Sequence, residues 1–368
     1  MEKRWVYGLL KKEPVLIISV FLALASMIVV PPSALYAASI DWQTIAVLFA
    51  LMLIVSGLEH HRVLKALSDA LLTVTADLRG VAFSLVALTF FSSMLITNDV
   101  ALITFVPLTI IAFTGSGEER SLMYVIILET IAANVGSALT PVGNPQNLFL
   151  YNHYRLSAMT IARVMLPYVV SALILLTLLL LAVPRTKSPK SGPATESEAL
   201  SALQVTRYLA LFAVAIATVF HRIPWPLGVT IVAVASEKRL YRTVDYSLLA
   251  TFIALFILVG NLSSLPSVET FFAEHLKGRE FFLSLALSQV LSNVPATLLL
   301  SQFTDNALEL LKGVNVGGCG TLIASMASVI SFRLFSTHTE GKTLRYLLLF
   351  SLLNILFLLL FITLHRFF

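Results

Sequence analysis

The stretch SMLITNDVALI, residues 93–103, places an amide and a carboxylate in the middle of a long apolar run. From Val81 to Phe113, Asp99 is the only residue with a charged side chain. Carboxylates are costly to place inside apolar segments that cross a membrane, and where they occur they usually serve a function. The surroundings of Asn98 and Asp99 therefore decide both the fold and the role of the chain.

The composition of the 368-residue chain is that of a membrane protein. Apolar residues make up 58% and charged residues 12%, and the mean hydropathy is +0.90. Soluble domains carry about 25% charged residues, so a soluble fold is excluded. We predict an all-α polytopic membrane protein. The net charge of +5 fits basic residues in cytoplasmic loops, and we expect no nucleic-acid partner.

Apolar segments along the chain give the candidate spans. They are Leu16–Val30, Ile45–Gly57, Ser121–Leu139, Val164–Val183, Leu209–Phe220, Leu227–Ala235, Leu248–Asn261, Val316–Phe332 and Leu344–Leu364. Leu227–Ala235 is the weakest of them, because it is short and follows the turn-like PWPLG. The first segment is either a signal-peptide core followed by ALYAA or, more simply, an uncleaved first span.

A faint internal repeat is present in the sequence. Asp41 and Asp245 each precede an apolar span that closes at a glycine, and an apolar stretch with a polar tip follows in each half. The tips are TNDVA and SNVPA. Asn-Val-Gly then precedes a polar, breakable stretch, which is SALTPVGNPQN in the first half and GCGTLIASMAS in the second. Four correspondences in the same order predict an internal repeat.

The repeat gives the predicted domain organisation. We expect a first repeat at 1–183, a cytoplasmic linker at 184–204 and a second repeat at 205–368. With the N terminus inside, 18 Lys and Arg residues fall on cytoplasmic segments and 7 on outer ones. On this path the halves are inverted copies, provided that Leu227–Ala235 crosses, as in many secondary transporters. We expect a multi-pass protein of the cytoplasmic (inner) membrane with a cytoplasmic N terminus.

Each repeat is predicted to contain a re-entrant hairpin and a broken helix. The inner hairpin, 81–113, turns at Thr97–Asp99, and the outer hairpin, 281–303, turns at Ser292-Asn293. The broken helices are 121–150 and 315–333, where proline and glycine cannot continue a helix. Helix N termini at such breaks suit an anion, and free carbonyls suit a small cation. We therefore expect one site for both near the bilayer centre.

The two acidic residues in apolar segments leave alternatives open. Asp99 is either a carrier of sodium or protons or a helix cap that accepts backbone N–H bonds. Asn98 and Asp99 together also fit a simple cap after a turn outside the membrane. Glu129 is either a second titrating group for proton or ion coupling or a structural partner of a Ser, Thr or Arg on a neighbouring helix.

The motifs SMLITNDVALITFVP, TPVGNPQN and SNVPATLLLS resemble the ion transporter superfamily, over roughly residues 40–365. This group includes arsenite permeases, sodium/proton antiporters, citrate transporters and divalent anion:sodium symporters. The resemblance implies a scaffold domain with a mobile transport domain, in a homodimer that works by an elevator-like movement. Carried over by position, it implies a substrate and ion site formed by Thr97, Asn98, Asp99, Thr140, Gly143, Asn144, Asn147, Ser292, Asn293, Gly318, Thr321 and Ser325.

The tips depart from the Ser-Asn-Thr pattern of the symporters. The third position is Asp99 in one tip and Val294 in the other, so the paired hydroxyls for a dicarboxylate are missing. No Arg or Lys falls within the predicted hairpin cores or broken helices, apart from Arg333 at the last position of the second broken helix. These departures weaken dicarboxylate uptake and leave arsenite-type solutes, monovalent cations or a sodium-coupled anion.

The predicted function is secondary active transport of a small anion or oxyanion-like solute, citrate-like or arsenite-like, coupled to sodium or protons. A sodium/proton antiporter without organic substrate and an ion or solute channel stay open. We expect no enzyme, because an intramembrane hydrolase needs a nucleophile–base pair or two facing aspartates and only Asp99 lies in an apolar core. We expect no cofactor and no metal other than transported sodium, and the expected partners are the lipid bilayer and the solute.

Overall fold

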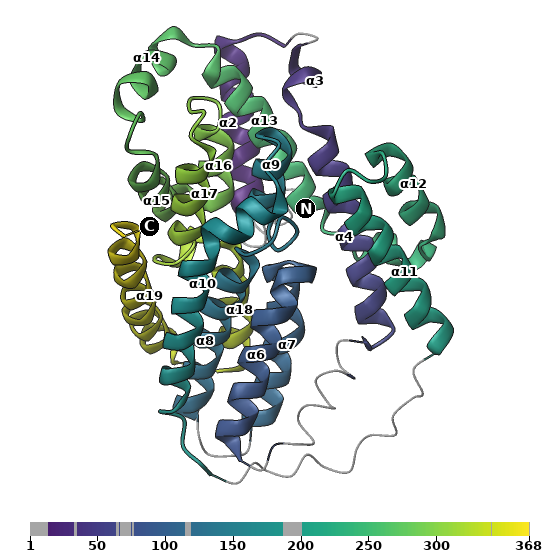
Figure 1. The fold of residues 1–368 in the computed structure, drawn as a ribbon, viewed down its shortest axis with the longest axis vertical. Coiled ribbons are helices and arrows are strands. Elements are labelled where there is room, and N and C mark those ends of the chain that lie inside the picture. Colours follow the sequence, from purple (N-terminus) through teal and green to yellow (C-terminus); the bar gives the residue numbers. More distant parts are fainter. Residues whose placement is uncertain are drawn as a thin grey trace, which may run out of the picture. The chain divides into compact units, whose positions relative to one another are not determined.

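The computed structural model in Figure 1 describes residues 14–32, 35–63, 66, 75, 77–114, 119–186, 201–339 and 341–367. The regular elements in this part of the chain are helices, which confirms the predicted all-α fold. Six of the described helices are long and apolar enough to cross a membrane, which confirms a polytopic membrane protein. They are α4 (Trp42–His60), α6 (Leu78–Ile96), α10 (Ala158–Leu180), α11 (Ala202–Val219), α13 (Tyr246–Ser263) and α19 (Thr343–His365).

Shorter apolar helices accompany these spans. They are α2 (Pro14–Val29), α7 (Asn98–Phe113), α12 (Trp225–Ala235) and α15 (Glu280–Leu291). The 11 residues of α12 rise about 16 Å at 1.5 Å per residue, roughly half of the hydrocarbon thickness. The inverted orientation of the halves, which requires this segment to cross, stays a prediction.

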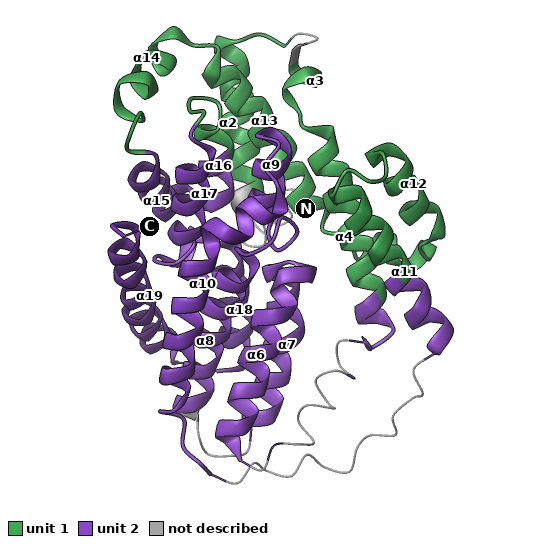
Figure 2. Cartoon of the chain, viewed as in Figure 1, with its two compact units in different colours: residues 1–57, 210–279, 298–305 green, residues 58–209, 280–297, 306–368 purple. Residues whose placement is uncertain are grey.

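The chain forms two compact units that do not follow the sequence halves (Figure 2). The first unit contains residues 1–57, 210–279 and 298–305, and the second contains 58–209, 280–297 and 306–368. Each unit takes segments from both predicted repeats, and the second unit contains every predicted site residue. Residues 187–200 of the predicted linker lie outside the described residues.

In the first unit, α2 packs along α13, and a buried amide joins them. The Asn261 Nδ2 of α13 donates to Ser26 Oγ and to Tyr36 OH, both at 2.9 Å. Tyr36 belongs to the short helix α3 (Leu35–Ser39). The shorter elements η1 (Lys238–Arg242) and α14 (Pro266–His275) also belong to this unit.

The second unit is built on two similar helix packings (Figure 1). Helices α6 and α7 lie side by side and both contact α8 (Glu119–Ser137), and α15 packs on α17 (Ala307–Gly317). A glycine permits each close approach: a Cβ on Gly136 would lie 2.3 Å from Phe90 O, and one on Gly317 would lie 2.7 Å from Ser288 Cβ. Helix α18 (Met326–His338) packs against α7 and α8, and α19 contacts α8, α10 and α17.

The predicted hairpins and broken helices fall on paired elements of this unit, except for residues 298–303 at the end of the outer hairpin, which belong to the first unit. Segment 81–113 is α6 and α7, separated at Thr97, and segment 281–303 is α15 and α16 (Asn293–Leu300), separated at Ser292. The first broken helix is α8 followed by α9 (Pro145–His153). The second is α17 followed by a loop, the turn η2 (Leu322–Ala324) and α18.

The second broken helix begins at Ala307, eight residues before its predicted start at 315. Its first helix, α17, contains Glu309 and Lys312. Because of these two charges, residues 307–314 were not recognised as part of an apolar helix. In the structure Lys312 Nζ lies 2.8 Å from Glu309 Oε1, and this pairing lets the lysine be buried. The expectation that the broken helices contain no basic residue is therefore wrong, because α17 contains Lys312 and α18 contains Arg333.

Candidate functional site

Each predicted hairpin is interrupted at a hydroxyl-bearing residue whose backbone φ is positive. Thr97 has φ 70° and ψ 148°, and Ser292 has φ 75°. Positive φ is uncommon outside glycine, and for a β-branched residue it is a genuine outlier that costs on the order of 1–3 kcal/mol. Strain of this kind clusters at functional sites. The two tips thus share a positive φ at a hydroxyl-bearing residue.

The first tip is bonded to the loop that breaks the first helix. The Asn98 backbone N–H donates to Gly143 O at 3.0 Å, and the Thr140 hydroxyl donates to Met94 O. Glycine is required at position 143 because a Cβ there would lie 2.2 Å from Ser137 O. The first tip and the loop at 140–144 are therefore held together by hydrogen bonds, and residues of both belong to the site that the family resemblance implies.

Asn144 and Asn147 hold this loop together. Asn144 is the N-cap of α9, and its Oδ1 accepts the N–H of Asn147 at 2.9 Å. The Asn147 Nδ2 donates to Ala138 O at 3.0 Å and to Thr140 O at 3.1 Å. These unwound carbonyls, which we expected to be available to a cation, already accept hydrogen bonds. Asn147 therefore supports the geometry of the loop.

The second broken helix is held in a comparable way by Gln289, a residue of α15. Its Nε2 donates to Gly317 O at 2.8 Å and to Cys319 O at 3.3 Å. The backbone N–H of Thr321 donates to Gln289 Oε1 at 2.9 Å, and the Thr321 hydroxyl donates to Gln289 O at 2.8 Å. Gly320, with φ 137°, leaves room for this amide, since a Cβ there would lie 2.1 Å from its Oε1. The predicted site residue Thr321 is thus bound to the outer hairpin.

Asn134, near the end of α8, is the centre of the polar cluster. Its Oδ1 accepts from Asn98 Nδ2 at 3.1 Å and from Ser325 Oγ at 2.9 Å, and its Nδ2 donates to Gly318 O at 3.4 Å. Asn98 is the first residue of α7, and Ser325 is the N-cap of α18. Two helix N termini therefore meet at one amide oxygen, and neither has a capping hydrogen bond from its N-cap side chain.

Asn315 of α17 makes the reciprocal contacts to the first half. Its Oδ1 accepts from Asn144 Nδ2 at 3.1 Å, and its Nδ2 donates to Asn147 Oδ1 at 2.7 Å and to Leu311 O at 2.9 Å. Asn134 belongs to the first predicted repeat and binds the second, while Asn315 belongs to the second and binds the first. The two broken helices are therefore joined by buried amides on both sides.

The second tip borders the same cluster. A Cβ on Gly318 would lie 3.1 Å from Asn293 Nδ2, so the Asn293 amide lies against this glycine. The Ser292 Oγ lies 3.5 Å from Ala324 O, next to the start of α18. The tips at Asn98 and Asn293 therefore converge on the contact between Asn134 and Gly318.

Asp99 lies in the first turn of α7 with its side chain half-buried. Its backbone N–H donates to Asn98 Oδ1 at 3.0 Å. The N-cap of this helix is Thr97, whose side chain makes no capping hydrogen bond. Because Asp99 follows the residue that contacts Asn134, a charge on its carboxylate acts on any solute bound at the cluster.

Glu129 belongs to a separate buried group, formed by α6, α7 and α8. The Thr109 hydroxyl donates to Glu129 Oε1 at 2.8 Å, and the Thr89 hydroxyl donates to the same oxygen at 3.4 Å. Glu129 Oε2 is buried and has no hydrogen-bond partner among the described residues. On the next residue of α8, the Thr130 hydroxyl donates to Ser331 Oγ at 2.7 Å. Glu129 therefore has the hydroxyl partners that a structural role predicts, together with one oxygen that is free to bind a proton.

Asn134, Gln289 and Asn315 are not among the site residues predicted from the sequence. The repeated Asn-Val-Gly motif contained both asparagines, but it served only to mark the repeat. The motif is explained by the structure, because its asparagine binds the opposite half and its glycine packs on the hairpin helix. Nothing in the sequence around Gln289 distinguished it from other polar residues of α15.

Comparison with known proteins agrees with this architecture. Residues 5–331 match the family described as citrate transporter. The chain is 33% identical over 324 residues to an uncharacterized transporter of Methanocaldococcus jannaschii, and the match covers 87% of this chain and 88% of that protein. It is 34% identical over 304 residues to inner membrane protein YbiR of Escherichia coli, covering 81% of each. A shorter match to the putative transporter arsB of Dictyostelium discoideum is 29% identical over 113 residues, 30% of this chain and 19% of that protein.

The family match contains both hairpins, the first broken helix and the second as far as residue 331 in α18. These segments meet at Asn134. The membrane-length helices lie before, between and after them along the chain. The protein is therefore a multi-pass membrane transporter, and the chain belongs to the citrate transporter family.

Proposed function

We propose that the chain is a secondary active transporter that moves a small anion or oxyanion-like solute, citrate-like or arsenite-like, together with sodium ions or protons. The observation that carries the proposal is the meeting of the α7 and α18 N termini at Asn134 Oδ1. Each N terminus carries about half a positive charge, and two that meet repel each other unless negative charge lies between them. An anion or the polar oxygens of an oxyacid at this place interact favourably with both.

Asp99 supplies the reason for coupling to a cation. Its carboxylate lies in the first turn of α7, beside the place where the anion is proposed to bind. A carboxylate repels a neighbouring anion, and the repulsion is strong where water is excluded. A sodium ion or a proton bound at Asp99 removes the repulsion, so each ligand raises the affinity for the other.

The groups around Asn134 also indicate which charge on the solute the cluster can accommodate. The groups bonded to Asn134 are uncharged: the Asn98 amide and the Ser325 hydroxyl donate to it, and the Gly318 carbonyl accepts from it. A citrate-like polyanion bound there depends on co-bound cations for charge balance, since buried charges require compensation. A neutral arsenite-like oxyacid needs less compensation. The family description supports the first class of solute, and the name of the arsB relative supports the second.

The two compact units support an elevator-like movement. The second unit contains both tips and both broken helices, so a site formed by them can move as one body. The first unit then serves as the scaffold, and we keep the homodimer that the resemblance implies. The N terminus is proposed to lie in the cytoplasm.

The test is counterflow in proteoliposomes that contain the purified full-length protein. External labelled solute is supplied from a panel of carboxylates, sulfate and arsenite, with and without sodium and at two pH values. We expect one solute class to be accumulated only when sodium or a proton gradient is present. Asp99→Asn should abolish the dependence on the cation, while the exposed Asp305→Asn, which makes the same chemical change, should retain it.

Two results contradict the proposal. Solute flux that never exceeds equilibration and ignores the cation indicates a channel. Unchanged sodium and pH dependence in Asp99→Asn removes the carrier role of Asp99 and leaves the anion site at Asn134 to be tested by Asn134→Ala.

A sodium/proton antiporter is the second candidate function, and the buried Glu129 favours it. Its free Oε2 and two hydroxyl partners make a compact proton site at a distance from the amide cluster. For an antiporter we expect sodium-driven proton flux without any organic or oxyanion solute, and its loss in Glu129→Gln. The exposed Glu269→Gln is the matched control. Proton flux that persists in Glu129→Gln assigns Glu129 a structural role.

A further inference from the structure

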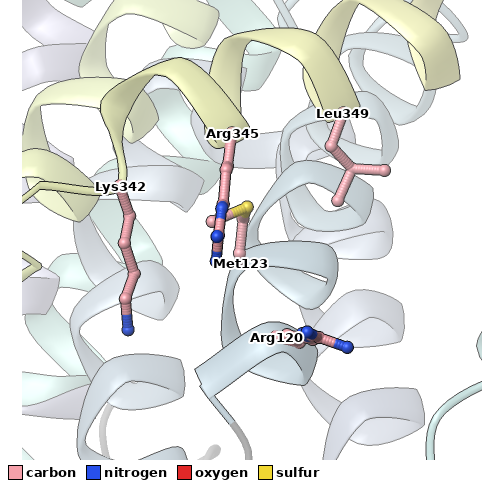
Figure 3. A pocket seen from close by; sticks show the side chains of 5 residues that line it. All are labelled: Arg120, Met123, Lys342, Arg345 and Leu349. Carbon is pink, nitrogen blue, oxygen red and sulfur yellow. The ribbon is translucent and has the colours of Figure 1, made fainter.

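A cationic pocket lies between the first turns of α8 and α19, at the end of α8 opposite to Asn134. Its volume is about 420 Å³, within the range of ordinary ligand sites. It is lined by Arg120, Met123, Lys342, Arg345 and Leu349. In Figure 3, Lys342 and Arg345 project from the start of α19 toward α8, where Met123 and Arg120 lie.

The described lining side chains carry three positive charges and no carboxylate. Arg120 and Arg345 are exposed, and Lys342 is half-buried. The guanidinium group offers paired N–H donors that match the oxygens of a phosphate, and a lysine adds a point charge. The pocket therefore suits a phosphate-bearing anion in chemistry and in size.

The pocket continues into apolar surface. Met123 is buried, and Leu349 is half-buried beside the cations. Beyond them α19 exposes large apolar side chains at helical spacing. The exposed set is Leu344, Leu348, Leu352, Ile355, Leu356 and Leu359. Leu348 and Leu352 are neighbours of Arg345 and Leu349 on the helix surface, so this apolar stripe begins at the rim of the pocket.

A phosphate group joined to hydrocarbon chains matches both parts of this surface. We propose that the pocket binds the phosphate headgroup of an anionic phospholipid, with its acyl chains along the exposed leucines of α19. A free phosphate matches the three cations but not the apolar stripe. On the predicted orientation, the beginnings of α8 and α19 lie at the cytoplasmic face, where polybasic sites attract anionic lipids. The site is distinct from the amide cluster, and its existence does not depend on the proposed solute.

The experiment is native mass spectrometry of the full-length protein released from nanodiscs of phosphatidylcholine with a fixed fraction of phosphatidylglycerol. The pocket variant carries Arg120→Gln, Lys342→Gln and Arg345→Gln. The matched control carries Lys238→Gln, Arg242→Gln and Arg333→Gln, three exposed cations outside the pocket. Both variants change the charge of the protein equally. A third arm adds excess inorganic phosphate to the wild-type protein.

We expect phosphatidylglycerol adducts on the wild type and on the control. Each basic group near an anionic lipid contributes about fivefold in affinity, so the pocket variant should bind on the order of a hundredfold more weakly. Inorganic phosphate should not displace the lipid. If the triple variant is unstable in detergent, Arg345→Gln alone, at an exposed position, should lower binding about fivefold.

Other outcomes overturn the proposal. An equal loss of adducts in the pocket variant and the control means that the lipid follows overall charge and not the pocket. Displacement by inorganic phosphate assigns the pocket to a soluble anion. Adducts of phosphatidylcholine that equal those of phosphatidylglycerol in the wild type show that the cations do not select the headgroup.

Discussion

Replacing Thr97 by glycine should stabilise the protein while it removes a group from the site. With φ 70° and ψ 148°, Thr97 lies close to a region of backbone conformation that is populated almost only by glycine. The strain is on the order of 1–3 kcal/mol, and the extra unfolded-state freedom of glycine offsets about 0.5–1 kcal/mol of the relief. The Thr97 hydroxyl makes no hydrogen bond within the described residues, so its removal costs little folding free energy. We expect a net gain of about 1 kcal/mol.

The control is Thr97→Ala, which removes the hydroxyl but keeps the Cβ and the strain. Thermal unfolding in one detergent, followed by tryptophan fluorescence, compares the three proteins. A change of 1 kcal/mol shifts Tm by about 2–4 °C in proteins of 150–250 residues, and by somewhat less in a longer chain such as this one. Thr97→Gly should therefore unfold at least 1 °C above Thr97→Ala.

The same comparison at Ser292, where φ is 75°, should give a difference of the same sign. In counterflow, Thr97→Ser should retain activity, while the glycine and alanine variants should both lose it if the hydroxyl binds the solute. An alanine variant that is more stable than the glycine variant at both tips would refute the strain argument. Full transport by Thr97→Ala would show that the Thr97 hydroxyl does not bind the solute, and the strain at this tip would then need another explanation.

Three further substitutions test the packing of the second unit, each by Tm in detergent with the yield of folded protein as a second readout. Gly136→Ala should lower stability by several kcal/mol, because its Cβ would lie 2.3 Å from Phe90 O. Overpacking costs about 1–3 kcal/mol even where the neighbouring atoms can move. A Tm within 1 °C of the wild type would contradict the close approach of the two helices. Asn315→Ala removes the hydrogen bond to Asn147 Oδ1 and one of the two acceptors of Asn144 Nδ2, which keeps Ser137 Oγ, for a loss of about 1–3 kcal/mol. An unchanged Tm would mean that water replaces the amide. Glu309→Gln leaves the buried Lys312 without its carboxylate and should lower stability by about 1–3 kcal/mol, an effect that a second change, Lys312→Met, should largely reverse.

The architecture was predictable because its signals are local. The polar tips at 97–99 and 292–293 stand out against the apolar residues on either side of them, and their recurrence in both halves favours a pair of hairpin tips over a simple helix cap. The breaks after Ser137 and Gly317 are encoded by proline and glycine, which cannot continue a helix. A membrane allows irregular backbone only where protein or water covers it, so these breaks were expected to lie together.

What the sequence could not provide is the pairing between distant segments. Asn134 and Gly318 are 184 residues apart, and the contact depends on how the two broken helices pack. Gln289 is one of several polar residues on α15, and only the packing of α15 on α17 selects it to hold the second loop. The start of α17 was missed for a related reason, because the pairing of Glu309 with Lys312 allows a charged segment to be buried.

The reciprocal amide contacts bear on how the proposed transporter moves. Alternating access in proteins built from repeats often occurs by rocking of one half against the other. In this chain the halves are joined inside one compact unit by four buried hydrogen bonds of 3.1 Å or less, which link Ser325 to Asn134, Asn144 to Asn315, Asn315 to Asn147 and Thr130 to Ser331.

Side-chain hydrogen bonds between membrane helices average about 0.6 kcal/mol and reach about 1.7 kcal/mol, so breaking all four would cost roughly 2–7 kcal/mol in every cycle. Moving the second unit as one body breaks none of them. This difference favours the elevator-like movement, and it predicts that a cross-link between the halves at these helices would leave transport intact, whereas rocking requires the same cross-link to stop it.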